Sequence, residues 1–146
     1  MPTNWTAVIR LRESERDQQA QRVAAAGREL QQREAACHAA RETLQQALEE
    51  ARGQGANGVV EVRQLAAQRA HVSRLQGVVE TRQRNEAAAR EAWQQEQSLL
   101  VAAEQRLEQL ERLWQQQQSA AAAQAAKRQQ HELEELWASQ KGVRSN

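Results

Sequence analysis

The sequence predicts an all-α fold, a two-helix antiparallel coiled-coil hairpin with a longer, projecting C-terminal helix. Three observations lead to this prediction. Apolar residues recur at every seventh position in two long stretches of the chain. Between these stretches, residues 53–58 hold three of the six glycines. The composition favours helix throughout, because 28 Ala and 25 Gln accompany a single Pro at position 2.

The seven-residue spacing keeps one seam of an α-helix facing a partner helix. Before the glycine-rich stretch, the seam row is Ile9, Arg16, Val23, Leu30, Cys37, Leu44 and Ala51. After that stretch it is Leu65, Val72, Val79, Glu86, Trp93, Leu100, Leu107, Trp114 and Ala121. With no Phe, no Tyr and few large side chains, the chain fills a thin two-helix seam rather than a thick core.

The elements follow from caps and breakers, and they form one domain over residues 1–146. A first helix over about residues 4–52 begins at Thr3 or Asn4, either of which can cap it. The glycines predict a turn at 53–58. A second helix over about 59–140 then ends before Gly142, which leaves a frayed tail at 141–146. Folding the chain at the turn places Trp5 near residue 106, so that residues from about Glu108 to Gln140 project without an internal partner.

Several positions weaken the predicted seam. Arg16 and Glu86 stand where Leu is expected, and such polar residues fix register at a cost in stability. The predicted register places Glu86 opposite about residue 25. Gly27 and Gly77 each cost about 1 kcal/mol relative to Ala in a helix. Helix pairs at i,i+4 offset part of this cost, namely Glu29/Arg33, Glu80/Arg84, Glu86/Arg90 and Glu108/Arg112.

Charge and motif content exclude several function classes. The net charge is +1 and the signs alternate along both helices, so no basic face for nucleic acid is expected. There is no phosphate-binding glycine loop, and a two-helix hairpin offers no concave site for catalysis. We therefore expect a non-enzyme without catalytic residues or cofactor. The absence of a long apolar run or signal segment predicts a cytoplasmic protein without direct membrane insertion.

The remaining reactive side chains have structural interpretations. The single Cys37 lies in the seam row and is expected to be a small buried residue, with a reactive or ligand role as the alternative. His38 and His71 can approach each other across the hairpin, but we interpret them as exposed helix residues rather than metal ligands. Large aromatics at the aromatic-poor chain ends, Trp5 and Trp137, are interface candidates, with coverage of the open hairpin end as the alternative.

A family resemblance follows from particular blocks of the chain. These are Glu91-Ala92-Trp93, the run from Leu107 through Leu110, Leu113 and Trp114, the segment Lys127-Arg128-Gln129-Gln130-His131-Glu132-Leu133-Glu134-Glu135-Leu136, and the opening Val8-Ile9-Arg10-Leu11-Arg12. Together with the short first helix and longer second helix, they resemble the FliJ/YscO (SctO) family, the central stalk proteins of type III export ATPases in bacterial flagella and virulence injectisomes. Glu134 stands where the family pattern has Asp. The absence of Tyr near the end of the first helix favours an injectisome member.

The resemblance implies a mechanism and a set of contacts. In that family the end bearing both termini inserts into the pore of a hexameric ATPase and promotes its assembly and ATP hydrolysis. The long helix also contacts the export gate at the cytoplasmic face of the secretion apparatus, and some members bind export chaperones. The ATPase-binding residues expected here are Trp5, Arg10, Arg12, Trp114, Lys127, Arg128, Glu134, Glu135 and Trp137. The export-gate contact is expected at Leu75, Val79, Arg82 and Glu86.

A different class of function stays open on the sequence alone. A free-standing coiled-coil scaffold or oligomerisation protein, without an ATPase partner, has the same heptads. An apolar helix end without an internal partner is typical of a binding site, but self-association into a dimer or bundle also covers it. The stalk interpretation predicts a monomeric hairpin when free, whereas the scaffold interpretation predicts a stable dimer or a larger assembly.

Overall fold

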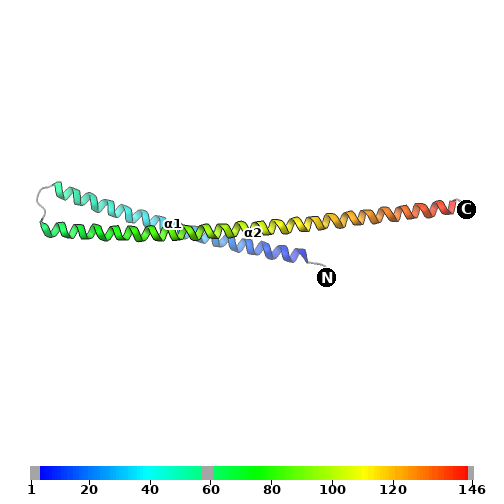
Figure 1. Ribbon diagram of the computed structural model, residues 1–146, viewed down its shortest axis with the longest axis horizontal. Helices are drawn as coiled ribbons and strands as arrows, with labels where there is room; N and C mark the ends of the chain where they lie inside the picture. Colours follow the sequence, from blue (N-terminus) through cyan, green and yellow to red (C-terminus); the bar gives the residue numbers. More distant parts are fainter. Residues whose placement is uncertain (1–3, 57–60, 145–146) are drawn as a thin grey trace. The chain divides into compact units, whose positions relative to one another are not determined.

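The computed structural model describes residues 4–56 and 61–144, which form two α-helices (Figure 1). Helix α1 covers Trp5–Ala56, 52 residues, and α2 covers Val62–Arg144, 83 residues. The described residues contain no strand, so the predicted all-helical class is confirmed. Neither helix, over the residues described, is long and apolar enough to cross a membrane.

Helix α1 begins at a side-chain cap. Asn4 Oδ1 accepts a hydrogen bond from the backbone N–H of Ala7 at 3.3 Å, and the Asn4 carbonyl accepts from Val8 N–H at 3.2 Å. An acceptor side chain at this position satisfies a donor that the first helical turn leaves free. Of the two predicted caps, Thr3 lies outside the described residues and Asn4 is the cap observed.

Both helices extend beyond the boundaries expected from the glycines. Helix α1 continues through Gly53 and Gly55, and α2 starts at Val62 and continues through Gly142. None of these three glycines has the left-handed backbone that ends a helix. A glycine in a helix costs about 1 kcal/mol without ending it, so glycine content alone misplaced these boundaries. Residues 57–58 of the expected turn lie outside the described residues.

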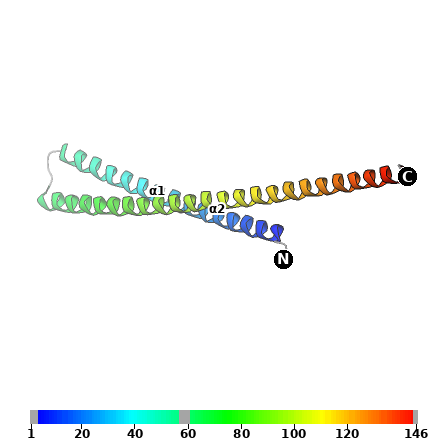
Figure 2. The same cartoon turned by 45° about the vertical axis from the view of Figure 1, so that its right-hand side comes forward.

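The chain divides into two compact units, which we describe separately. One is Asp17–Ala102, and the other combines Met1–Arg16 with Ala103–Asn146. Within Asp17–Ala102, segments of α1 and α2 lie side by side in both ribbon views (Figures 1 and 2). Gln19 contacts Glu96, whereas Glu34 contacts Arg90. Later residues of α1 therefore meet earlier residues of α2 within this unit.

The thin core follows the predicted heptad row. All seven predicted seam residues of α1 are buried or half-buried, as are those of α2 between Val72 and Trp114. Leu65 and Ala121, at the two ends of the α2 row, are exposed. The apolar residues with least exposure are Leu30, Cys37, Ala47, Val79 and Leu107.

The register differs from the expected one. The Glu86 carboxylate is close enough to the Cys37 thiol to raise its pKa, so Glu86 lies beside Cys37 rather than near residue 25. The extended helix boundaries account for part of this shift. Because α1 continues to Ala56 and α2 begins only at Val62, the midpoint between the helix ends lies later in the chain than the centre of a turn at 53–58.

The exposed part of α2 also begins later than expected. Leu107 is buried and Leu110 and Trp114 are half-buried, whereas every residue from 115 to 142 is exposed. The expected boundary at Glu108 is therefore displaced by about one heptad.

Candidate protein-binding surfaces

The C-terminal segment of α2, residues 115–142, carries large apolar side chains in water. Leu133 and Leu136 are each 59% exposed and Trp137 is 66% exposed. These residues stand at i, i+3 and i+4, so they share one side of the helix. A cluster of large apolar residues on an otherwise polar helix indicates a surface that a partner covers.

Two shallow surface grooves flank this cluster. One is lined by Gln130, Leu133, Glu134, Trp137, Ala138 and Lys141. The other is lined by Glu132, Glu135, Leu136 and Ser139. Both grooves mix apolar and charged side chains. The first places Glu134 and Lys141 beside the apolar residues, and the second places Glu132 and Glu135 beside Leu136.

The nine residues predicted to bind an ATPase all belong to the unit that combines Met1–Arg16 with Ala103–Asn146. Arg10, Lys127, Arg128, Glu134, Glu135 and Trp137 are exposed, whereas Trp5, Arg12 and Trp114 are half-buried. Arg12 forms an ion pair with Glu15 at 2.9 Å. The exposed residues are accessible to a partner, whereas the half-buried ones are partly covered by other residues of the chain.

The four residues predicted to bind an export gate have different surroundings. Arg82 is exposed and Leu75 is half-buried, but Val79 is only 8% exposed. The Glu86 side chain is 19% exposed and forms an ion pair with Arg90 at 3.1 Å. Of the four, Arg82 alone is freely exposed to a partner.

Glu86 belongs to a polar cluster that links the two helices. Arg90 Nη2 lies 3.1 Å from a carboxylate oxygen of Glu34 on α1 and 3.1 Å from one of Glu86 on α2. Desolvation, followed by the hydrogen bond to Glu86, raises the pKa of the Cys37 thiol, and the nearby Arg41 lowers it. Cys37 is 1% exposed, which confirms the predicted buried seam residue. Its raised pKa keeps it a thiol, the less reactive form.

A second buried polar contact, between Gln19 and Glu96, has no signal in the apolar heptad row. The Gln19 amide donates a hydrogen bond to the Glu96 backbone carbonyl at 2.9 Å and another to the Glu96 carboxylate. Gln19 lies in a second seam row, four residues before the apolar one, whose other members are Trp5, Arg12, Ala26, Arg33, Ala40 and Ala47. Small and polar residues dominate this row, so only its offset from the apolar row could have revealed it.

The histidines are exposed, as expected. His38 lies 3.1 Å from Glu42 and His131 lies 3.9 Å from Glu135, both one helical turn away. His71 is exposed on α2. Over the described ranges, no three His, Cys, Asp or Glu residues are grouped as metal ligands.

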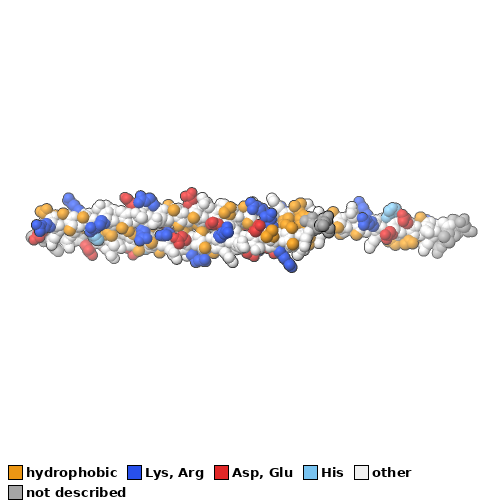
Figure 3. Space-filling model, turned by 90° about the horizontal axis from the view of Figure 1, so that it is seen from below, with side chains coloured by type: hydrophobic (Ala, Val, Ile, Leu, Met, Phe, Trp, Pro, Cys, Tyr) orange, Lys and Arg blue, Asp and Glu red, His pale blue; other side chains and the backbone are white. Residues whose placement is uncertain are grey.

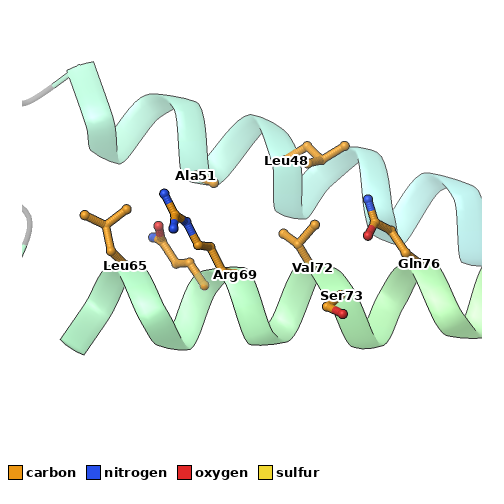
Figure 4. A pocket seen from close by; sticks show the side chains of 8 residues that line it. Leu48, Ala51, Leu65, Arg69, Val72, Ser73 and Gln76 are labelled. Carbon is orange, nitrogen blue, oxygen red and sulfur yellow. The ribbon is translucent and has the colours of Figure 1, made fainter. Parts of the chain in front are cut away.

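An open apolar groove lies between α1 and α2 within Asp17–Ala102 (Figure 4). Leu48 and Ala51 of α1 face Leu65 and Val72 of α2, with Arg69 beside them. Leu65 is 41% exposed, so the predicted seam is incompletely closed near this end of the helices.

The surface charges are mixed, as expected for exposed helices. Figure 3 shows basic and acidic side chains interspersed along the face in view. Predicted helix pairs are confirmed for Glu29/Arg33 at 2.8 Å, Glu86/Arg90 at 3.1 Å and Glu108/Arg112 at 2.6 Å. Arg84 instead donates a hydrogen bond to Thr81 Oγ1 at 3.4 Å, so the predicted pair with Glu80 is not the contact observed.

Comparison of the chain with protein-family models, with curated proteins and with solved structures gives no match.

Proposed function

We propose that this protein is the stalk of a type III secretion or flagellar export apparatus. It enters a hexameric export ATPase, promotes its assembly and activity, and links it to the export gate. The observation that carries the proposal is the exposed segment at 115–142, which bears Leu133, Leu136 and Trp137 within the block that resembles the FliJ/YscO (SctO) family.

The proposal also specifies how the two helices are arranged. We infer that α1 and α2 form an antiparallel coiled-coil hairpin and that α2 projects from it beyond residue 114. Support comes from the heptad row of shielded residues and from the contacts Gln19–Glu96 and Glu34–Arg90. The projecting helix presents Lys127, Arg128, Glu134 and Glu135 to the ATPase, with Trp137 as its apolar anchor.

This proposal keeps fewer export-gate residues than the family resemblance implies. Val79 and Glu86 already pack or pair within Asp17–Ala102, so binding through them requires the two helices to separate. Arg82 is exposed and remains the proposed gate contact. Export chaperones are further proposed partners, and the cytoplasmic face of the apparatus is the proposed location.

Hydrolysis by the export ATPase of the same apparatus tests the proposal. We expect the full-length protein to co-migrate with that ATPase on a sizing column and to increase its rate of ATP hydrolysis. A chain ending at Trp114 keeps the shielded residues Leu107 and Leu110, so it should stay helical and lose both effects. No co-migration and no stimulation by the full-length protein would contradict the stalk function and favour a free-standing scaffold.

A matched pair of variants separates a specific surface from general apolar exposure. Trp137→Ala should weaken ATPase binding by at least about tenfold, since buried aromatic anchors typically contribute 2 kcal/mol or more. Leu99→Ala removes an apolar side chain of similar exposure, 54%, from Asp17–Ala102 and should leave binding unchanged. Equal losses in the two variants would contradict the assignment of the binding surface to residues 115–142.

A further inference from the structure

The exposed segment of α2 has large and small residues on the same face. At 100° per residue, Ala122, Ala126, Leu133 and Trp137 lie within about 60° of one another. The first two are small and the last two are large, and all four are exposed. The small half of this face leaves room for the large half of a second, oppositely directed copy.

Two charged residues beside this face, Lys127 and Glu134, would also pair with each other between two antiparallel copies. Lys127 and Glu134 are seven residues apart and therefore lie on the same flank of the helix. Both are exposed, and neither forms an ion pair with another residue in the described part of the chain. In an antiparallel helix pair, equivalent flanks face each other, so Lys127 of each copy meets Glu134 of the other. The twofold axis then passes between Gln130 and His131.

The two features require the same register. With the axis between Gln130 and His131, Trp137 of one copy lies level with Gln124 of the other, between Ala122 and Ala126 of the paired face. Alanine allows close approach of the helices, so the aromatic ring packs on methyl groups and backbone rather than on another large side chain. A parallel arrangement instead places Trp137 on Trp137, so that large side chains meet large ones and the alanines meet alanines.

We propose that residues 119–140 of α2 bind the same segment of a second copy of this chain as an antiparallel, twofold-symmetric helix pair. The inference does not rest on the export function. If that function holds, the self-paired segment is the one that would enter the ATPase, so the dimer is a form in which this surface is blocked.

Mass in solution across a concentration series tests the pairing. We expect the full-length chain to change from the mass of one chain to that of two chains as concentration rises. Lys127→Glu converts two attractive contacts into two repulsive ones and should raise the dissociation constant about tenfold. Glu134→Lys should do the same, and the charge-swapped double variant, Lys127→Glu with Glu134→Lys, should restore pairing.

Matched controls use the neighbouring residues. Arg128→Glu and Glu135→Lys make the same charge changes one residue later, on the side of the helix away from the proposed face, and should leave the dissociation constant unchanged. A single-chain mass at every concentration would overturn the proposal. Equal effects of Lys127→Glu and Arg128→Glu, or failure of the double variant to restore pairing, would overturn it as well.

Disulfide formation tests the direction of the pair. In a Cys37→Ala background, Gln130→Cys lies beside the twofold axis and should oxidise to a covalent dimer. Gln140→Cys lies on the same face but far from the axis, and should not. Efficient dimerisation at both positions would indicate a parallel pair and overturn the antiparallel arrangement.

The ATPase assay is independent of this outcome. A chain that pairs with itself but never stimulates an ATPase supports the self-pairing and contradicts the stalk function. A chain that stimulates the ATPase and has a single-chain mass at every concentration does the reverse.

Discussion

Gln19 of α1 donates a hydrogen bond to the backbone carbonyl of Glu96 on α2, at a distance of 2.9 Å. The same amide contacts the Glu96 carboxylate, and Gln19 is 8% exposed. A shielded amide that binds both the backbone and the side chain of its partner fixes the relative position of the two helices at this level. It does so within a seam that has few large apolar residues to fix their register.

We expect Gln19→Ala to lower the free energy of unfolding by about 1–2 kcal/mol, because it removes a shielded hydrogen bond and leaves the carboxylate without this donor. Urea denaturation followed by circular dichroism measures the change. Gln18→Ala is the control, since Gln18 is exposed and the gain in helix propensity is the same. Equal stabilities of the two variants would show that the Gln19 contact contributes nothing.

The Cys37 thiol should be protected and its environment should make stability depend on pH. Burial and Glu86 raise its pKa above the usual 9.0, so the folded state binds the thiol proton more tightly than the unfolded state does. This contribution is present below the usual pKa and is lost as the pH rises through the folded value. We therefore expect the free energy of unfolding to fall from pH 8 to pH 10 by more in the wild type than in Cys37→Ala.

The same thiol should react slowly with Ellman's reagent at pH 8 and rapidly after unfolding in urea. Glu86→Gln removes the charge that opposes ionisation and should speed the reaction in the folded state. A folded-state rate equal to that of the unfolded chain would contradict the burial of Cys37.

Two glycines inside helices, Gly27 and Gly77, can each be replaced by alanine to gain stability. Only Gly27 lies next to a tryptophan, so only its substitution should change tryptophan fluorescence. Gly77→Ala should raise the free energy of unfolding by about 0.5–1 kcal/mol, because apart from the adjacent backbone of its own helix no atom lies within 4 Å of the added methyl group. In Gly27→Ala the methyl group would lie 3.4 Å from Trp93 Nε1, so a similar gain should accompany a shift in the Trp93 fluorescence. Thermal melts and emission spectra of both variants check this, and a shift in the Gly77 variant would contradict the stated surroundings.

Arg90 should contribute a salt-dependent share of stability. Its side chain is 51% exposed and contacts both Glu34 and Glu86, so Arg90→Ala should cost only about 0.5–1 kcal/mol at low ionic strength. The cost should shrink in 1 M NaCl, where charges are screened over about 3 Å. Arg82→Ala, which changes an exposed arginine of the same helix, is the control and should have little effect at either salt concentration.

The sequence predicted the seam better than the register. Leu30, Cys37, Val79 and Leu107 were foreseen as shielded because a seven-residue apolar repeat depends only on helix geometry. Register depends on where the helices end, and Gly53 and Gly55 were expected to end a helix that continues past them. That error accounts for part of the displacement of Glu86 from about residue 25 to Cys37.

The polar contacts were harder to foresee for a different reason. Gln19 and Glu96 are ordinary surface residues in a helix, and only their opposition across the seam makes them partners. For the candidate binding surface, the exposed apolar residues were predictable, because Leu133, Leu136 and Trp137 stand out in a polar, alanine-rich context. Val79 and Glu86 belong to the predicted seam row, and only the family resemblance assigns them a gate contact, which their burial does not favour.

The exposed segment of α2 has one consequence for recognition. From residue 115 to 142 its helical form depends on local backbone hydrogen bonds and on a high content of Ala, Gln and Glu, rather than on a tertiary core. The partner proposed for this segment would therefore meet a helix that is already ordered, and association would not carry the entropy loss of folding a flexible tail, about 1–2 kcal/mol for each residue fixed. In that proposal the alanine-rich stretch, which has no large apolar side chain to offer a partner, would contribute to affinity by holding Leu133, Leu136 and Trp137 in place before binding.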